Sequence, residues 1–149
     1  MIKLYKCDID VELEKGLKIL DPKDAYRWAL ICSEHTLNIF NIKNNHQIDL
    51  ALQTINNNLD NVENETAKQI SNLINNEAEN LKTQNISLYL MFKALASTVA
   101  TLYSKKHAVY SAIYSASAIY YKTKNKELVE NEKLYQLEKL NKFLIMYEE

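Results

Sequence analysis

Glycine and proline are almost absent from this sequence, which contains one of each in 149 residues. Average usage gives about seven glycines and about five prolines per hundred residues. Sheets with tight turns depend on these two residues, because glycine adopts positive φ angles readily and proline presets φ. The chain is therefore expected to be all-α, with helices joined by short polar connections.

Length and charge narrow the possibilities further. A chain of 149 residues fits one domain, so residues 1–149 are expected to form a single helical domain. The apolar fraction of 47% is ordinary for a globular protein. A net charge of −1, from 18 basic and 19 acidic side chains, excludes a generally basic nucleic-acid-binding protein. No nucleic-acid partner is expected.

The sequence lacks the usual signs of export, membrane insertion or metal binding. Residues 1–8 are too charged for the apolar core of a signal peptide. The longest uncharged stretch, 108–121, is shorter than the roughly twenty residues that span a bilayer. Cys7 and Cys32 have neither paired spacing nor histidine partners at zinc-site spacing. We expect a cytoplasmic protein with reduced thiols, and no membrane partner, metal or cofactor.

Two segments are apolar around most of their circumference, which is typical of helices in the middle of a bundle. The first, 24–40, follows Asp21 and Pro22, a capping residue and a proline suited to the first helical position. The second, 86–121, consists of two helices with Ser104 as a cap between them. We expect a single-domain bundle of about six helices around these two segments, with a short helix over 10–20 before them.

Amphipathic helices are expected on the outside of the bundle, over 48–62, 67–81 and 126–147, because their apolar residues recur with helical periodicity. With so little glycine, the helix caps must come from Asp21, Ser104 and asparagines. Residues 41–82 contain six acidic side chains and three lysines. This acidic, asparagine-rich surface is a candidate partner-binding face, although a plain solvated face is the more ordinary interpretation. Its acids are Asp49, Asp60, Glu63, Glu65, Glu77 and Glu79.

Four tyrosines form one stripe if the helix continues through Ser104. They are Tyr103, Tyr110, Tyr114 and Tyr121. Tyrosine is favoured at interfaces because it offers apolar area with a polar tip. Packing at helix contacts is the favoured interpretation, and a homodimer through the stripe is the alternative.

No catalytic motif is visible: the sequence has no glycine-rich phosphate loop and no nucleophile elbow. His35 shares a helical face with Trp28, and His107 lies near the start of a helix. Glu34 is adjacent to His35 but about 100° away around the helix, so the two cannot easily bind one metal. Hydrogen-bonded structural histidines are favoured over ligands or catalytic bases.

Residues 28–40 read Trp-Ala-Leu-Ile-Cys-Ser-Glu-His-Thr-Leu-Asn-Ile-Phe, which resembles the signature helix of the immunity-5-like family of bacterial immunity proteins. The stretch from Ala100-Thr101 through His107-Ala108 to Tyr114-Ser115-Ala116 resembles the family's alanine-rich central pair of helices. Asn131-Glu132 and Gln136-Leu137 resemble its closing helix. Ser33 stands where the family commonly has alanine, and Tyr103 where it commonly has histidine.

The resemblance implies an all-helical, non-enzymatic protein, encoded beside a toxin, that protects its producer by binding that cognate toxin. The positions that match the family are Trp28, Cys32, Glu34, His35 and His107. The alternative is a small helical enzyme or metal-binding protein using His35, Glu34 and His107, which requires these three side chains to meet in one cleft.

Overall fold

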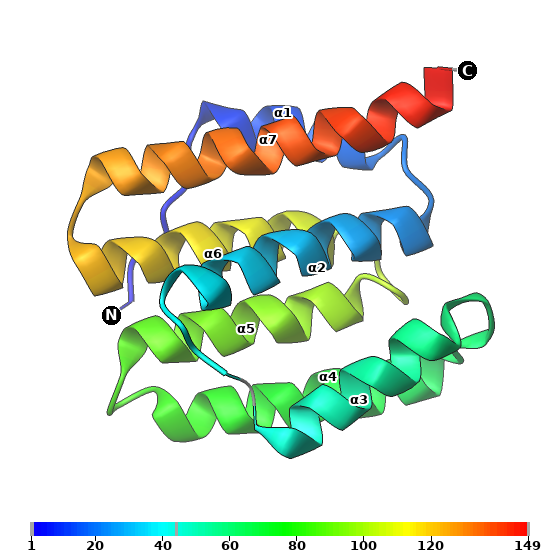
Figure 1. Cartoon of the computed structure of the whole chain (residues 1–149), viewed down its shortest axis with the longest axis horizontal. Helices are drawn as coiled ribbons and strands as arrows, with labels where there is room; N and C mark the ends of the chain where they lie inside the picture. The colour runs from blue at the N-terminus through cyan, green and yellow to red at the C-terminus, as the bar shows by residue number, and fades with distance from the viewer. Residues whose placement is uncertain (1, 44, 149) are drawn as a thin grey trace.

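The computed structural model describes residues 2–43 and 45–148, and within these residues it contains α-helices and no strands (Figure 1). The prediction of an all-α chain is confirmed. The described residues form seven α-helices, one more than the expected six or so. They are α1 (Asp8–Leu17), α2 (Pro22–Ile39), α3 (His46–Asn57), α4 (Asn64–Leu81), α5 (Ile86–Ala100), α6 (His107–Thr123) and α7 (Lys126–Glu148), with a 3-10 turn at Leu59–Asn61.

The helices stack in layers, with three hydrophobic clusters of buried residues between them in the described part of the chain. In Figure 1, α1 and α7 lie together at the top, α2 and α6 lie in the middle, and α5 separates them from the α3–α4 hairpin at the bottom. α5 is buried around nearly its whole circumference because α4 packs on one side of it and α6 on the other. The core thus runs through α2, α5 and α6, as their apolar sequences predict.

The two central segments differ in continuity. The first, expected over 24–40, is the single helix α2, and its buried face includes Tyr26, Trp28 and Cys32. The second, expected over 86–121, is divided into α5 and α6 by a turn at residues 101–106. α5 and α6 therefore fold back against each other as a hairpin, which is among the most extensive helix contacts in the molecule.

Polar side chains cap the helices in place of glycine. Asp21 accepts a hydrogen bond from the Asp24 N–H (2.9 Å) at the start of α2. Asparagines do the same at three further helix starts: Asn45 before α3, Asn85 before α5 and Asn125 before α7. The prediction for Ser104 was wrong, because its backbone carbonyl accepts the N–H of His107 and α6 has no side-chain cap.

The single glycine is used for close packing. Gly16 lies in α1 where that helix crosses α7, and a Cβ atom at this position would lie 2.7 Å from Cδ2 of Leu140. Asn41 (φ 53°) and Lys124 (φ 56°) adopt the left-handed backbone conformation at helix ends, where glycine is usual. Close approach at Gly16 lets Leu13 and Leu17 reach the core, and the short helix expected over 10–20 is present as α1 with the bounds Asp8–Leu17.

Among the described residues, none of the helices combines the length and apolar character that a bilayer-spanning segment requires. Both cysteines are free thiols, with Cys7 exposed and Cys32 buried.

Candidate functional site

The helix that carries the family-like signature, α2, is joined to α7 by buried polar groups. Trp28 is completely buried, and its indole N–H donates to the backbone carbonyl of Gln136 on α7 (3.0 Å). The side-chain amide of Gln136 in turn donates to the carbonyl of Ala112 on α6 (3.0 Å). Trp28 and Gln136 therefore tie three helices together at one point.

His35 and Glu132 form a second link between the same two helices. Nδ1 of His35 lies 2.8 Å from Oε1 of Glu132, and the imidazole ring stacks on Tyr135 with 3.6 Å between ring centroids. The Glu132 side chain is 2% exposed, whereas that of His35 is 31% exposed. The carboxyl group thus lies inside the bundle and holds a histidine that reaches the surface.

Burial shifts the pKa values of both side chains of this pair. Desolvation raises the pKa of Glu132 to about 8, partly offset by the neighbouring Lys133 ammonium. Desolvation, helped by Lys139, lowers the pKa of His35. One proton shared between the carboxyl group and the imidazole therefore satisfies both partners at neutral pH, so we assign the pair one proton and no net charge.

The second oxygen of Glu132 has no hydrogen-bond partner among the described residues, and the same holds for Ser115 Oγ and Gln136 Oε1. Cys32 lies nearby and is fully buried, and burial raises the pKa of its thiol, with the carboxylate of Glu132 acting in the same direction. A buried thiol with a raised pKa is a poor nucleophile. The cluster can orient an imidazole, but it supplies no activated nucleophile.

The other family-matching residues lie on different surfaces. Glu34 lines a hollow of about 290 Å³ together with Asp49, and partial burial and the Asp49 charge raise its pKa. The ring of His107 makes edge contacts with Tyr103 and Tyr110, and burial lowers its pKa. His35, Glu34 and His107 therefore have separate surroundings, and no group of three metal-binding side chains occurs in the part of the chain that the structure describes.

The acids of the candidate partner-binding face fall into two groups at opposite ends of the α3–α4 hairpin. Asp60, Glu63 and Glu65 lie around the turn between the helices, whereas Asp49 lies at the start of α3, and Glu77 and Glu79 near the end of α4. At 1.5 Å per residue, the twelve residues from Glu65 to Glu77 separate the groups by about 18 Å. Asp60 also pairs with Lys23 (2.8 Å).

The four tyrosines do not form one continuous stripe, because the helix is broken before α6. Two of them lie beneath lysine ammonium groups, Tyr103 under Lys68 and Tyr114 under Lys93. The hydroxyl of Tyr121 accepts a hydrogen bond from the backbone N–H of Lys3 (2.8 Å). Tyr110 is the most exposed of the four, at 43%.

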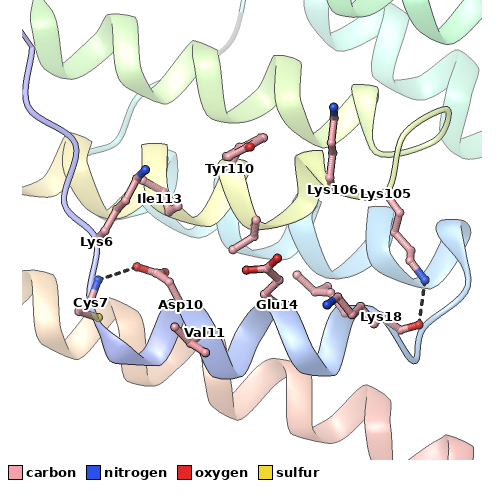
Figure 2. Close-up of a pocket in the computed structure, with 12 residues that line it drawn as sticks. Lys6, Cys7, Asp10, Val11, Glu14, Lys18, Lys105, Lys106, Tyr110 and Ile113 are labelled. Atoms are coloured by element: carbon pink, nitrogen blue, oxygen red, sulfur yellow. Dashed lines mark hydrogen bonds between the residues drawn. The ribbon is translucent and has the colours of Figure 1, made fainter.

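A groove of about 480 Å³ runs between α1 and α6 (Figure 2). Lys6 lies at one end of the groove and Lys105 at the other, and the carboxyl group of Glu14 lies between the two helices. Asp10 lies on the inner side of α1 and pairs with Lys133, a buried lysine of α7. The groove is distinct from the His35–Glu132 pair, which lies between α2 and α7.

The family model described as Imm-5 like putative immunity protein matches residues 17–143. The chain belongs to this family. No curated protein and no solved structure matches the chain. The Imm-5 like match spans α2 to α7, so the Trp28–Gln136 and His35–Glu132 contacts lie inside the family's region, whereas most of α1 lies outside it.

Two buried residues of this Imm-5 like protein, Glu132 and Lys133, were not predicted from the sequence. Glu132 and Lys133 stand in a helix rich in Glu and Lys, and such residues are almost always solvated unless paired. Their partners, His35 and Asp10, precede them by 97 and 123 residues. One signal in the sequence could have drawn attention to Glu132. It lies in Asn131-Glu132, a segment that resembles the family, as the segment around His35 does.

Proposed function

We propose that the chain is an immunity protein that neutralises a cognate protein toxin by direct binding, without catalysis. Membership of the Imm-5 like family over residues 17–143 is the observation that carries this proposal. The free thiols agree with a partner that is met in the reducing cytoplasm of the producing cell.

The contacts of the family-matching residues support binding over catalysis. His35 is engaged by Glu132 and Tyr135, and the Trp28 indole is engaged by Gln136. These side chains join α2 to α7, so their contacts stabilise the fold. An enzyme or metal site built on His35, Glu34 and His107 would need them in one place, and their separate surroundings give that alternative no support.

The acid-rich hairpin is one candidate surface for the toxin. Exposed carboxylates on α3 and α4 would attract a basic partner and accelerate its association. The division of the acids into two groups favours the turn end, where Glu63 and Glu65 are both exposed and close in sequence.

The proposal is tested with the protein encoded by the adjacent gene. We expect the two proteins to co-purify, and cells that express the neighbour to survive only when this chain is co-expressed. A neighbour that harms no cell, or a toxic neighbour that this chain neither binds nor neutralises, would contradict the proposal.

Charge reversal tests the hairpin as the contact surface. Glu63→Lys with Glu65→Lys should weaken binding to a basic toxin, because both carboxylates would become repulsive. Glu127→Lys with Glu130→Lys is the matched control, since both glutamates are exposed and lie on α7 outside the hairpin, and Glu127, like Glu65, lies in the first turn of its helix. Equal binding by the two double variants would exclude the hairpin as the contact.

A further inference from the structure

The groove between α1 and α6 combines an apolar lining with a basic rim. Apolar side chains from both helices line it, namely Val11 and Leu17 from α1, and Val109, Tyr110 and Ile113 from α6. Val11 is 54% exposed and Tyr110 is 43% exposed, so apolar surface is open to solvent on both walls. Single exposed apolar residues are ordinary, but here they line one hollow of about 480 Å³.

The charge in the groove is predominantly positive. Lys6, Lys18, Lys105 and Lys106 line it, and none of them forms an ion pair within the described part of the chain. Lys105 donates to the backbone carbonyls of Lys18 (3.0 Å) and Leu20 (2.7 Å), so its charge is held in place without being neutralised.

Two carboxylates also line the groove, but they do not balance the lysines. Asp10 pairs with Lys133 and accepts the backbone N–H of Cys7 (2.9 Å), so its charge is already compensated. Glu14 is then the one carboxylate without an ion-pair partner against the four lysines that line this described pocket. The groove therefore attracts an acidic partner.

We propose that this groove docks an amphipathic helix of the toxin, with an apolar stripe in the groove and carboxylates toward its lysines. This inference rests on the proposed function, since it names the surface and the chemistry by which the toxin is held. In Figure 1 α1 lies at the top and the α3–α4 hairpin at the bottom, so the acids of the hairpin lie away from α1, and the lysines of the groove favour an acidic segment.

The dimensions of the groove fit a short helical segment. α1 has ten residues, which gives it a length of about 15 Å. Apolar anchors at i, i+3, i+4 and i+7 of a partner helix span about 10 Å, which fits within that length. The lysines near both ends of α1, Lys6 and Lys18, would meet carboxylates that flank such a stripe.

Two substitutions test the groove while leaving the core intact. Val11→Glu places a carboxylate in the apolar lining, and Lys106→Glu reverses a charge at the exposed start of α6, where an acid suits the helix dipole. Each should weaken toxin binding by about tenfold or more, because Val11→Glu sets a carboxylate against the apolar stripe of the partner and Lys106→Glu turns an attraction for its carboxylates into a repulsion.

The controls are matched in exposure and position. Leu134→Glu introduces the same carboxylate at an apolar side chain that is 56% exposed on α7, outside the groove. Lys126→Glu reverses an exposed charge at the start of α7. Both controls should bind the toxin as the unmodified protein does, and circular dichroism should show the same helix content for all four variants. Toxin binding that Val11→Glu and Lys106→Glu leave unchanged would overturn the inference.

A peptide measurement separates failure of the inference from failure of the proposed function. The probe is a synthetic helical peptide with leucines at i, i+3, i+4 and i+7 flanked by glutamates, compared with a copy in which lysines replace the glutamates. The glutamate peptide should bind, lose affinity with added salt, and lose binding to Val11→Glu. If the adjacent gene product does not bind but the glutamate peptide does, the proposed function fails and the chemistry of the groove stands.

If neither peptide binds, or both bind equally, the groove does not select an acidic helix and the inference is wrong. Concentration-dependent self-association that Val11→Glu abolishes would also overturn it, because the groove would then hold a second copy of this chain.

Discussion

Replacing Asp10 by asparagine should strongly destabilise the protein, because it leaves a buried lysine without its counter-charge. The Lys133 side chain is 2% exposed and the Asp10 side chain is 9% exposed, so solvent screens the pair very little. Removing one member of a buried ion pair costs about 3–5 kcal/mol. Asparagine can still accept the N–H of Cys7, so the substitution isolates the charge from the cap of α1.

Urea denaturation followed by fluorescence measures this effect directly. Trp28 is the single tryptophan and is fully buried, so its emission reports unfolding. With a denaturant slope of about 2 kcal/mol/M, a loss of about 4 kcal/mol lowers the urea midpoint by about 2 M. The control is Asp60→Asn, which breaks the exposed Lys23–Asp60 pair and should leave the midpoint almost unchanged.

A double variant completes the measurement. Asp10→Asn with Lys133→Met removes both charges, keeps an acceptor for the Cys7 N–H and should recover most of the lost stability, because no unpaired charge remains. If Asp10→Asn behaves like Asp60→Asn, the reasoning is refuted, and Lys133 then reaches water or another partner at little cost.

Three further predictions follow from single contacts. Because the folded-state pKa of Glu132 is raised from 4.5 to about 8, the stability that its proton provides is fully present below pH 4.5 and is lost as pH rises through 8; urea midpoints should show that Glu132→Gln removes this decline between about pH 5 and 8, and an unchanged decline would exclude Glu132 as its source. Gly16→Ala should lower the thermal midpoint despite a helix-propensity gain of about 1 kcal/mol, because the new Cβ would lie 2.7 Å from Leu140 Cδ2; a raised midpoint would show that the leucine moves freely. A thiol reagent should modify one cysteine quickly, the exposed Cys7, and the buried Cys32 only after unfolding; two fast thiols would contradict the burial of Cys32.

The sequence predicted the helices well because the information for them is local. Asp21 and Pro22 cap and begin α2 as expected, and the apolar periodicity of 48–62 and 67–81 corresponds to α3 and α4. The turn at 101–106 limited the prediction for the tyrosines, because a change of chain direction rotates the residues after it onto other surfaces. Spacing along a sequence defines a face only while the helix continues.

The buried polar cluster was hidden for a different reason. Glu132 and Lys133 are adjacent on α7, so they point in directions about 100° apart, one toward His35 of α2 and the other toward Asp10 of α1. Neither burial follows from the sequence of α7, which is a mixture of leucine, glutamate and lysine typical of a half-exposed helix. The partners come from the first 35 residues, and only the closed bundle brings them to α7.

The residues that hold the bundle together are different from the residues that are open to a partner. Trp28, Cys32 and His35, which carry the family resemblance, lie on the side of α2 toward α7, where Gln136 engages Trp28 and Glu132 engages His35. The groove takes one wall from α6 and the other from α1, a helix that lies almost wholly before residue 17, where the family match begins. Because the Asp10–Lys133 pair fixes α1 on α7, an exposed position of α1 that lines the groove, such as Val11, can vary while this pair, Gly16 and the buried Leu17 stay in place. A scaffold of this kind fits an immunity protein, whose fold has to persist while its contact surface matches one toxin.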